Sequence, residues 1–280
     1  MAVKPSLQRL ALLTGEAVLD KLAGTRAFVF GVGGVGSWCA EALVRSGIGE
    51  LVIVDSDSVC VTNINRQLQA TALNIGTPKV HALRDRLLEI APDCRISAIQ
   101  EIFSAQTALT FDIQIGDYVI DAIDSLGCKL DLIEYAHERG AHFFSAMGAA
   151  CKLDPTRLKV ADIWKSEGCP LARLVRNGLR KRGFKGHFPV VFSTEQIPRI
   201  TGIHTPCGSN RCMCPVSAEN GGINHEWCSS KKVINGSIVT VTACAGMILA
   251  SLVIRDVYGH ADPVQQELSQ SCVRKEKGQR

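Results

Sequence analysis

Five charged residues in the first half of the chain are of the types that bind and polarise phosphate groups. They are Asp55, Asp57, Arg66, Lys79 and Asp124. Lysine and arginine offset the negative charge of phosphates, and arginine adds a rigid fork of N–H donors. Aspartate oxygens accept hydrogen bonds from ribose hydroxyls or hold Mg²⁺. Together these types favour a nucleoside triphosphate site, because an NAD site has no obvious need for an arginine and a lysine just beyond its ribose-binding acid.

A glycine-rich turn precedes these charges and predicts where the phosphates bind. It follows the apolar run 27–30 and contains four glycines, Gly31, Gly33, Gly34 and Gly36. Residues without Cβ allow a tight turn, close approach of a phosphate to the backbone, and close packing of the next helix on the sheet. The first N–H groups of that helix then face the anion. By itself, this turn indicates only an adenine nucleotide.

Apolar runs alternate with helical patterns, and this alternation predicts the fold. Strands are expected at 27–30, 51–54, 95–99, 117–124 and 141–145. Residues 77–90 show helical spacing, and we expect Thr77 to cap this helix with Pro78 at its first position. Because strand and helix alternate, the strands should be parallel and joined by crossovers. We therefore predict an α/β fold: a Rossmann-like, doubly wound, mostly parallel sheet with helices on both faces and a C-terminal appended segment.

The carboxyl ends of the parallel strands are the expected ligand-binding edge. Asp55, Asp57, Asp121 and Asp124 all come at the ends of expected strands, so they should converge near the glycine turn. For Asp124, which is followed by Ser125 and a helix, we expect a role in binding Mg²⁺ on a triphosphate. For Asp121, capping of the following helix is an equally good interpretation.

Length and composition limit the classes of protein that fit. The chain has 280 residues, 46% hydrophobic and 21% charged, which is enough for one large core or a core plus a smaller lobe. We expect a nucleotide-binding domain over 1–170, a basic, cysteine-containing crossover over 171–235, a strand and helix over 236–272 that complete the domain, and a charged tail over 273–280. The net charge of +4 is mild and by itself indicates no nucleic-acid partner.

Twelve cysteines raise the question of disulfides or a metal. The first residues lack the apolar core of a signal peptide, so we expect a reducing, cytoplasmic setting. Cys207, Cys212, Cys214 and Cys228 form a C-x₄-C-x-C pattern with a distant fourth cysteine. A four-thiolate metal site and inert loop cysteines both fit this spacing.

A cluster of basic residues supplies locally the charge that the whole chain lacks. Between Leu171 and His187 there is no Asp or Glu, and the basic residues are Arg173, Arg176, Arg180, Lys181, Arg182 and Lys185. Such a segment can bind a phosphate backbone through salt-dependent contacts that do not depend on sequence. A solvated surface helix is the alternative interpretation.

The apolar run 237–254 is close to the length of a membrane span. A span needs about 20 predominantly apolar residues, and this run has 18 and includes two threonines. Its β-branched first half and alanine-rich second half favour a buried strand that leads into a packed helix. Membrane association is therefore the less favoured interpretation.

These motifs together resemble the adenylating E1-like family of ubiquitin-activating enzymes and bacterial sulfur-carrier adenylyltransferases. The resemblance covers roughly residues 9–195 and rests on the glycine turn, Asp55-x-Asp57, Asn63-x-Asn65-Arg66-Gln67, Pro78-Lys79 and Asp121-x-x-Asp124. Within that family the sequence is most similar to the tRNA threonylcarbamoyladenosine dehydratases, on phrases such as Val191-Phe192-Ser193-Thr194-Glu195. That similarity implies ATP-dependent cyclisation of the threonylcarbamoyl side chain of adenosine 37 through an acyl-adenylate.

The resemblance also implies residue roles. Gly34 would lie against the phosphates, Asp55 would hold the ribose, and Asp124 the metal. Arg9 resembles a family arginine that reaches the partner subunit's site, which would make the active unit a homodimer. Cys228 is at a position that resembles a cysteine of the dehydratases, and this resemblance gives only weak support for a catalytic role of Cys228. The remaining nucleotide-binding residues implied are Asn63, Asn65, Arg66, Gln67, Lys79 and Ser125. The partners implied are tRNA and a sulfur-relay protein of the SufE or CsdE type.

Two other functions remain open on the sequence alone. One is activation of the C-terminus of a ubiquitin-like sulfur carrier, although the chain lacks the paired C-x-x-C motifs of many such enzymes and any sulfur-transfer domain. The other is a non-catalytic or NAD-dependent nucleotide-binding module, which would leave Arg66, Lys79 and Asp124 without a purpose.

Overall fold

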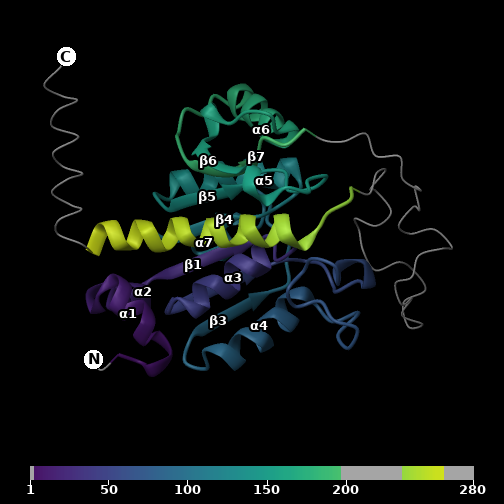
Figure 1. Ribbon diagram of the computed structural model, residues 1–280. Helices are drawn as coiled ribbons and strands as arrows, with labels where there is room; N and C mark the ends of the chain where they lie inside the picture. Colours follow the sequence, from purple (N-terminus) through teal and green to yellow (C-terminus); the bar gives the residue numbers. More distant parts are fainter. Residues whose placement is uncertain (1–2, 197–234, 262–280) are drawn as a thin grey trace, which may run out of the picture.

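A seven-stranded sheet organises the described part of the chain. The computed structural model describes residues 3–196 and 235–261, with the side chains of the last two residues excepted. The strands are β1 (Arg26–Phe30), β2 (Glu50–Val54), β3 (Arg95–Ile99), β4 (Tyr118–Asp121), β5 (His142–Ala146), β6 (Leu158–Asp162) and β7 (Pro189–Ser193). Their order across the sheet is β3-β2-β1-β4-β5-β7-β6 (Figure 1). All neighbours are parallel except β6, which pairs antiparallel with β7.

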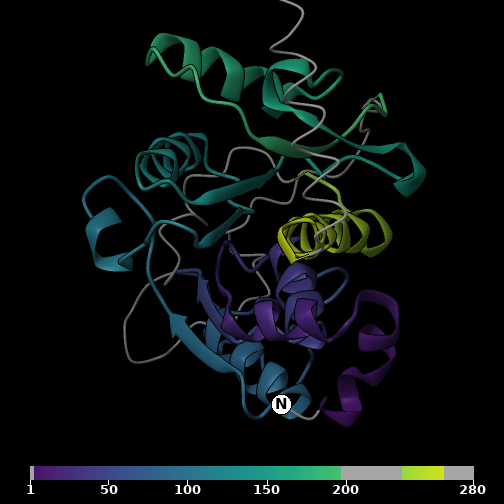
Figure 2. The ribbon, with the colours of Figure 1, turned by 90° about the vertical axis from the view of Figure 1, so that its left-hand side faces the viewer.

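Helices cover both faces of this sheet. They are α1 (Gln8–Thr14), α2 (Glu16–Gly24), α3 (Gly36–Arg45), α4 (Lys79–Ile90), α5 (Leu126–Glu138), α6 (Pro170–Lys181) and α7 (Val239–Ala261). Buried residues of α2, α3, α4 and α7 form one core on one face of the sheet, and those of α5 and α6 form a second core on the other. Figure 2 shows α7 and α5 on opposite sides of the sheet. The expected doubly wound α/β fold is confirmed.

Alternation along the central strand explains why two cores form. In β1, Ala27 and Val29 face the core that contains α3 and α7, whereas Phe28 and Phe30 face the core that contains α5. Successive side chains of a strand point to opposite faces. Every residue from Ala27 to Phe30 is buried and apolar, as expected for a parallel strand covered on both faces.

Three local expectations need correction. Helix α4 begins at Lys79 with Pro78 at the N-cap position, so Thr77 does not cap it. Strand β4 ends at Asp121, and Asp124 therefore lies in the turn that follows the strand. The segment 236–261 contains no strand: its β-branched residues belong to α7, because packing of one helix face on the core overrides the weak intrinsic preference of valine and threonine for strands.

The expected boundary at residue 170 also falls inside one structural unit. Helix α6 and strand β7 follow that position, yet β7 pairs with β5 in the same sheet. Helix α7 then returns across the face that carries α3, and the two helices approach closely at Gly246, where a Cβ would lie 2.4 Å from the carbonyl oxygen of Val35. Residues 3–196 and 235–261 thus share one sheet and its two cores.

Helix α7 is long and apolar enough to cross a membrane by length and composition alone. Val241, Ala245, Leu249, Val253 and Val257 recur at every fourth residue and are all buried, and the last four belong to the core that contains α3. This pattern is that of a helix with one face packed on a protein core, and it explains the apolar run without a membrane.

Candidate nucleotide-binding site

The glycine turn after β1 leaves no room for side chains at two positions. Gly31 has φ +84°, and a Cβ there would lie 2.7 Å from the carbonyl oxygen of Ala122. A Cβ on Gly36 would lie 1.9 Å from the carbonyl oxygen of Gly31. The turn therefore closes on itself and against the segment after β4, which only glycine permits. Gly36 is the first residue of α3, so the amino end of this helix opens at the turn.

Asp55 ties the end of β2 to this turn. One carboxylate oxygen accepts the N–H of Val32 at 2.8 Å, and the other accepts the N–H of Asp57 at 2.9 Å. Burial raises the pKa of the Asp55 carboxyl, and the nearby Lys79 opposes this shift. The carboxylate is thus fixed at the mouth of the glycine turn, in the place expected for a ribose-binding acid.

Lys79 is a buried cation beside two carboxylates. Its side chain is 7% exposed, and its Nζ lies 2.7 Å from Asp57 Oδ2 and 3.8 Å from Asp55 Oδ1. Burial lowers the pKa of the ammonium, but Asp55, Asp57 and the more distant Asp124 outweigh it, so the pKa lies above its ordinary value. Lys79 is therefore charged at neutral pH and available to an anion in the adjoining cavity.

Arg66 is held by the backbone of the loop between β2 and α4. Its guanidinium donates to the carbonyl of Thr62 at 2.9 Å and to Asn65 Oδ1 at 3.0 Å. The indole of Trp38 donates to the carbonyl of Arg66 at 3.0 Å, which fixes the backbone. Burial lowers the pKa of Arg66, while Cys60 and Asp124 oppose that effect. An arginine side chain keeps its charge in proteins, so this group stays cationic.

One cavity of about 900 Å³ brings most of the predicted residues together. It is lined by Gly31, Gly33, Gly34, Asp55, Asp57, Asn63, Arg66, Gln67, Lys79, Asp124 and Ser125. Gly36 does not line it. Asn65 does not line it: its side-chain amide donates to the carbonyl of Ser237 at 2.8 Å. The expectation that charged residues converge at the carboxyl edge of the sheet is therefore correct for Asp55, Asp57 and Asp124.

Asp121 does not belong to this cavity, and it does not cap a helix. It is fully buried, its Oδ2 lies 2.6 Å from the ammonium of Lys129, and its Oδ1 accepts the N–H of Ile123. Helix α5 instead starts after Ser125. This pairing was not predicted, because the partner lysine lies eight positions further along the chain, near the start of α5.

The cavity has a second part that the sequence did not predict. Beyond the glycine turn it is lined by residues 146–152, by 169–171 at the start of α6, and by Thr242 of α7. The rule that ligands bind after the carboxyl ends of parallel strands could have indicated the segment after β5. Nothing in the sequence indicated Thr242, which approaches Gly34 only because α7 returns to this edge: a Cβ on Gly34 would lie 3.2 Å from Thr242 Oγ1.

Arg9 lies away from this cavity. It is exposed on α1, and the turn before α1 packs beside Gly47, where a Cβ would lie 2.8 Å from Leu7 Cδ1. Gly47 precedes the amino end of β2, whereas the cavity lies at the carboxyl ends. Arg9 therefore does not line the site of its own chain.

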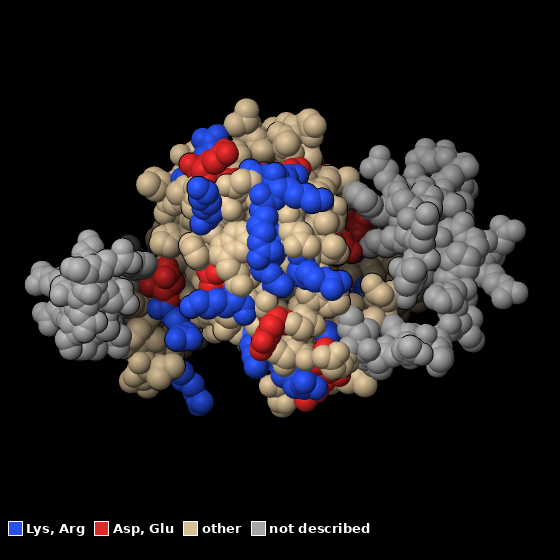
Figure 3. All heavy atoms as spheres, turned by 90° about the horizontal axis from the view of Figure 1, so that it is seen from above, with Lys and Arg blue, Asp and Glu red and all other residues tan. Residues whose placement is uncertain are grey.

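The six basic residues after position 171 divide into two groups. Three have partners: Arg176 donates to Ser166, Arg182 pairs with Asp131 and Glu134 on α5, and Arg180 lies over the ring of Trp164. The other three have exposed side chains and, within the described residues, no ion pair; they are Arg173, Lys181 and Lys185. Figure 3 looks onto the side of the molecule that carries α6, where Lys and Arg side chains gather.

The four cysteines of the possible metal site, Cys207, Cys212, Cys214 and Cys228, lie outside the described residues.

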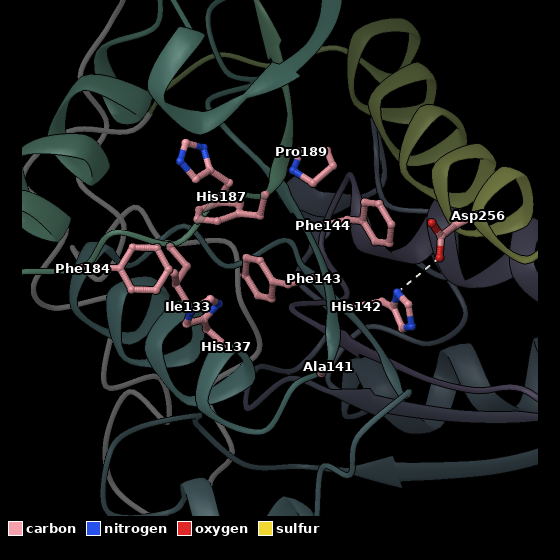
Figure 4. Close-up of a pocket in the computed structure, with 11 residues that line it drawn as sticks. Ile133, His137, Ala141, His142, Phe143, Phe144, Phe184, His187, Pro189 and Asp256 are labelled. Carbon is pink, nitrogen blue, oxygen red and sulfur yellow. Dashed lines mark ion pairs between the residues drawn. The ribbon is translucent and has the colours of Figure 1, made fainter. Parts of the chain in front are cut away.

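A smaller cavity of about 270 Å³ lies at the opposite edge of the sheet (Figure 4). It opens where β5 and β7 diverge, because these strands pair only at Ser145 with Val190 and at Ala146 with Val191. Phenylalanine and histidine rings line it, and His142 pairs with Asp256 at its rim. It has neither a glycine turn nor a lysine or arginine, so the larger cavity is the candidate nucleotide site.

A fold of this kind with a phosphate-binding turn, two cations and several carboxylates at one edge defines a nucleotide-binding α/β protein. The model of the ThiF family matches residues 6–276, and the chain belongs to this family. Among curated proteins, the chain is 43% identical over 184 residues to a tRNA threonylcarbamoyladenosine dehydratase of Bacillus subtilis, covering 66% of this chain and 72% of that protein. It is 34% identical to the Escherichia coli dehydratase, covering 90% and 92%.

The chain is also similar to a longer yeast relative, to a solved structure and to a more distant adenylyltransferase. Dehydratase 2 of Saccharomyces cerevisiae is 42% identical over 69% of this chain, which spans only 44% of that protein. A solved structure of the Escherichia coli dehydratase TcdA in complex with ATP has a TM-score of 0.75 and 31% identity, covering 93% of this chain and 98% of that one. The Escherichia coli ThiS adenylyltransferase is 26% identical over 71% of this chain.

Proposed function

We propose that the protein is an ATP-dependent tRNA threonylcarbamoyladenosine dehydratase that closes the side chain of adenosine 37 into a ring. The observation that carries this proposal is the cavity in which the glycine turn, Arg66, Lys79 and Asp124 meet a second part beside the start of α6. One part suits ATP, and the other leaves space for an acyl substrate next to the phosphates. The dehydratases named among the relatives support the same activity.

The reaction needs activation of a carboxylate, which is a poor electrophile. A carboxylate oxygen of the threonylcarbamoyl group attacks the α-phosphorus of ATP, and pyrophosphate leaves. The internal carbamoyl nitrogen then attacks the activated carbonyl carbon, loses its proton, and expels AMP with the original carboxylate oxygen. Ring closure needs no external nucleophile, and well-oriented intramolecular attack can gain roughly 7–11 kcal/mol. This chemistry requires no thiol, so Cys228 has no necessary role in it.

In this proposal the chain's own residues divide the work between them. The N–H groups around Gly34 contact the phosphates, and Asp55 binds the ribose. Asn63, Arg66 and Lys79 offset the negative charge that develops on the α-phosphate and pyrophosphate, a contribution that is commonly large in such transfers. Lys79 suits this role because it is already charged and buried.

Asp124 is our candidate for holding Mg²⁺. It borders the cavity within electrostatic reach of Arg66 and Lys79. Within residues 3–196 and 235–259, no cluster of three or more metal-binding side chains occurs. That fits Mg²⁺, which is usually held by one or two carboxylates together with substrate phosphates. When bound, the ion would neutralise phosphate charge.

The partners follow from the same site. Arg173, Lys181 and Lys185 would contact tRNA phosphates, with the other basic residues of this segment supporting the surface.

Because Arg9 lies far from the cavity of its own chain, we propose that it acts in the site of a second copy, which makes the active unit a homodimer. We place the reaction in the cytoplasm, where tRNA is available, and a sulfur-relay protein of the SufE or CsdE type is a further proposed partner.

A direct test compares two substrates. The protein is incubated with ATP labelled at the α-phosphate and either tRNA that carries threonylcarbamoyladenosine or a ubiquitin-like sulfur carrier. We expect labelled AMP with the tRNA, and a modified nucleoside lighter by one water in mass spectrometry. AMP or a stable adenylate formed only with the carrier would contradict the proposal and support the sulfur-carrier alternative. No activity with either substrate would point to a binding module.

A further inference from the structure

A fully buried polar network lies directly behind the candidate site. Lys129 and Asp121 have no exposed side-chain surface, and Lys129 Nζ lies 2.6 Å from Asp121 Oδ2. The same ammonium lies 3.1 Å from the carbonyl oxygen of Ala146 and 3.3 Å from Ser145 Oγ. Ser145 Oγ in turn donates to Asp121 Oδ2 at 2.6 Å. All three ammonium hydrogens thus have acceptors, and the network is complete without solvent.

Two bonds of this network fix segments that line the cavity. Asp121 Oδ1 accepts the N–H of Ile123 at 3.0 Å, which shapes the turn that leads to Asp124. The bond from Lys129 to the Ala146 carbonyl holds the end of β5, where the segment 146–152 begins. Lys129 itself lies in the first turns of α5, just after Ser125. One cation therefore connects the ends of β4 and β5 with the start of α5.

The same turn supports the phosphate-binding glycines. Gly31 packs so closely on Ala122 that a Cβ would lie 2.7 Å from its carbonyl oxygen. The N–H of Ala122 also donates to the carbonyl of Phe30 at 2.8 Å. A shift of the turn after β4 would thus move both Asp124 and the glycine turn.

Stability alone does not account for a network of this kind. Removing two charges from water is costly, and replacing a buried ion pair with apolar residues of similar volume is often neutral or stabilising. The network contacts three segments that line the cavity, so its location favours a role in positioning these segments over a role in stability. We propose that Lys129, with Asp121 and Ser145, is a positioning group that fixes Asp124 and the segment 146–152 relative to the glycine turn for Mg²⁺-dependent ATP binding and turnover. This inference rests on the proposed binding of ATP and Mg²⁺ at the site, and for turnover it also rests on the proposed dehydratase activity.

The test compares two double variants at opposite ends of the same strand. Lys129→Met with Asp121→Asn removes the charges of the network, while Arg26→Met with Asp117→Asn removes the ion pair at the amino end of β4. For both, the melting temperature, the affinity for ATP at several Mg²⁺ concentrations, and turnover are measured, the last two well below the melting temperature. We expect the network variant to need at least fivefold more Mg²⁺ for half-maximal ATP binding and to lose 10-fold or more in kcat, with the control variant within twofold of the parent.

Two outcomes would overturn the inference: equal effects of both double variants, or a network variant whose Mg²⁺ dependence matches that of the parent. If the double variant does not fold, Ser145→Ala removes only the hydroxyl, and the same shift in Mg²⁺ dependence is expected at a few-fold scale; a parent-like Ser145→Ala would then count against the inference. ATP binding can be measured without tRNA, so the positioning role can be tested separately from the dehydratase activity. If the parent binds Mg²⁺ and ATP but modifies no tRNA, the proposed function is contradicted, while the effect of the network on ATP binding can still be measured.

Discussion

Lys79 and Asp57 are hydrogen bonded across 2.7 Å at the floor of the candidate site. The lysine is buried, whereas the Asp57 side chain is 37% exposed toward the cavity. An anion that enters the cavity meets a cation already held in place by carboxylates, so little side-chain entropy is lost when the anion binds. The two carboxylates also keep the lysine protonated.

Replacing this lysine should affect both stability and activity. In Lys79→Met, Asp55 and Asp57 lose their cation, and we expect a loss of about 1–3 kcal/mol in the free energy of unfolding, because Asp57 is partly solvated and the pair is not fully buried. Adenylate formation should fall at least 100-fold. Urea denaturation and pyrophosphate exchange measure the two effects. Arg84→Met, at a half-buried residue of the same helix that pairs with Asp85, is the control and should change neither.

Asp124 offers a cleaner separation of function from folding. Its side chain is exposed in the turn before α5, so Asp124→Ala should leave the melting temperature within about 2 °C of the parent. Turnover should fall by about 10²–10³-fold, because the triphosphate loses its proposed metal ligand. Glu138→Ala, at the far end of α5, is the matched control. Unchanged activity at saturating Mg²⁺ would remove Asp124 from the site.

The proposed action of Arg9 across a dimer can be tested by complementation. Arg9→Ala and Lys79→Met should each be inactive alone. Mixed dimers of the two should regain activity, because one of the two sites then contains both a wild-type Arg9 and a wild-type Lys79. Turnover is measured after the subunits have exchanged, with exchange followed by a differently tagged copy. No recovery despite demonstrated exchange would show that Arg9 does not act in trans.

The proposed tRNA surface predicts a change in salt dependence. Replacing Arg173, Lys181 and Lys185 with Gln should weaken tRNA binding and lower the slope of log K against log salt by roughly 0.7–0.9 for each phosphate that the variant no longer neutralises. Affinity for ATP should be unchanged. The matched control replaces three basic residues that already pair with carboxylates on the opposite part of the sheet, namely Lys4, Arg84 and Arg95. Equal slopes for the two variants would exclude the α6 surface as the tRNA-binding site.

This set leaves out Arg180 and Arg182, which flank Lys181 in the sequence. In the structure, Arg182 bridges to Asp131 and Glu134 on α5. Its replacement would disturb the packing of α5 against α6 as well as the surface charge, and a loss of tRNA binding would be ambiguous.

The contact between α7 and the sheet should depend on pH. The hydrogen bond from His142 to Asp256 raises the pKa of the imidazole above its usual 6.5, with burial opposing and the charge of Asp256 adding to the shift. A group whose pKa is raised on folding stabilises the fold below its unfolded pKa, and this stabilisation is lost as the pH rises through the folded pKa.

We therefore expect the melting temperature of the parent to fall as the pH rises from below the usual imidazole pKa of about 6.5 through the folded pKa of His142. In His142→Gln this decrease should be smaller. Thermal denaturation of both proteins across this range measures the difference. His187→Gln, a similar change at a more exposed histidine paired with Asp162, serves for comparison. The His142 contribution is absent if parent and His142→Gln show parallel curves.

The sequence by itself determined the order of the first five strands and most of the residues expected at the candidate nucleotide site. Glycine spacing, apolar runs of strand length and the acid after each run are local signals, and parallel strands bring such ends to a common edge. Asp55, Asp57, Lys79 and Asp124 could be assigned to one site for that reason. Gly31 and Gly36 could be anticipated because tight turns exclude Cβ wherever they occur.

Only the tertiary structure decided which polar residues face the cavity and which are buried behind it. Asp121 and Asp124 are three positions apart and look alike in sequence, yet one is fully buried against Lys129 and the other is exposed. The run after position 236 became a helix instead of a strand because its apolar positions match a long face of the core beside α3. Thr242 lines the cavity because it lies on this helix, α7. Such outcomes depend on contacts between residues far apart in the chain, and a local pattern carries no information about them.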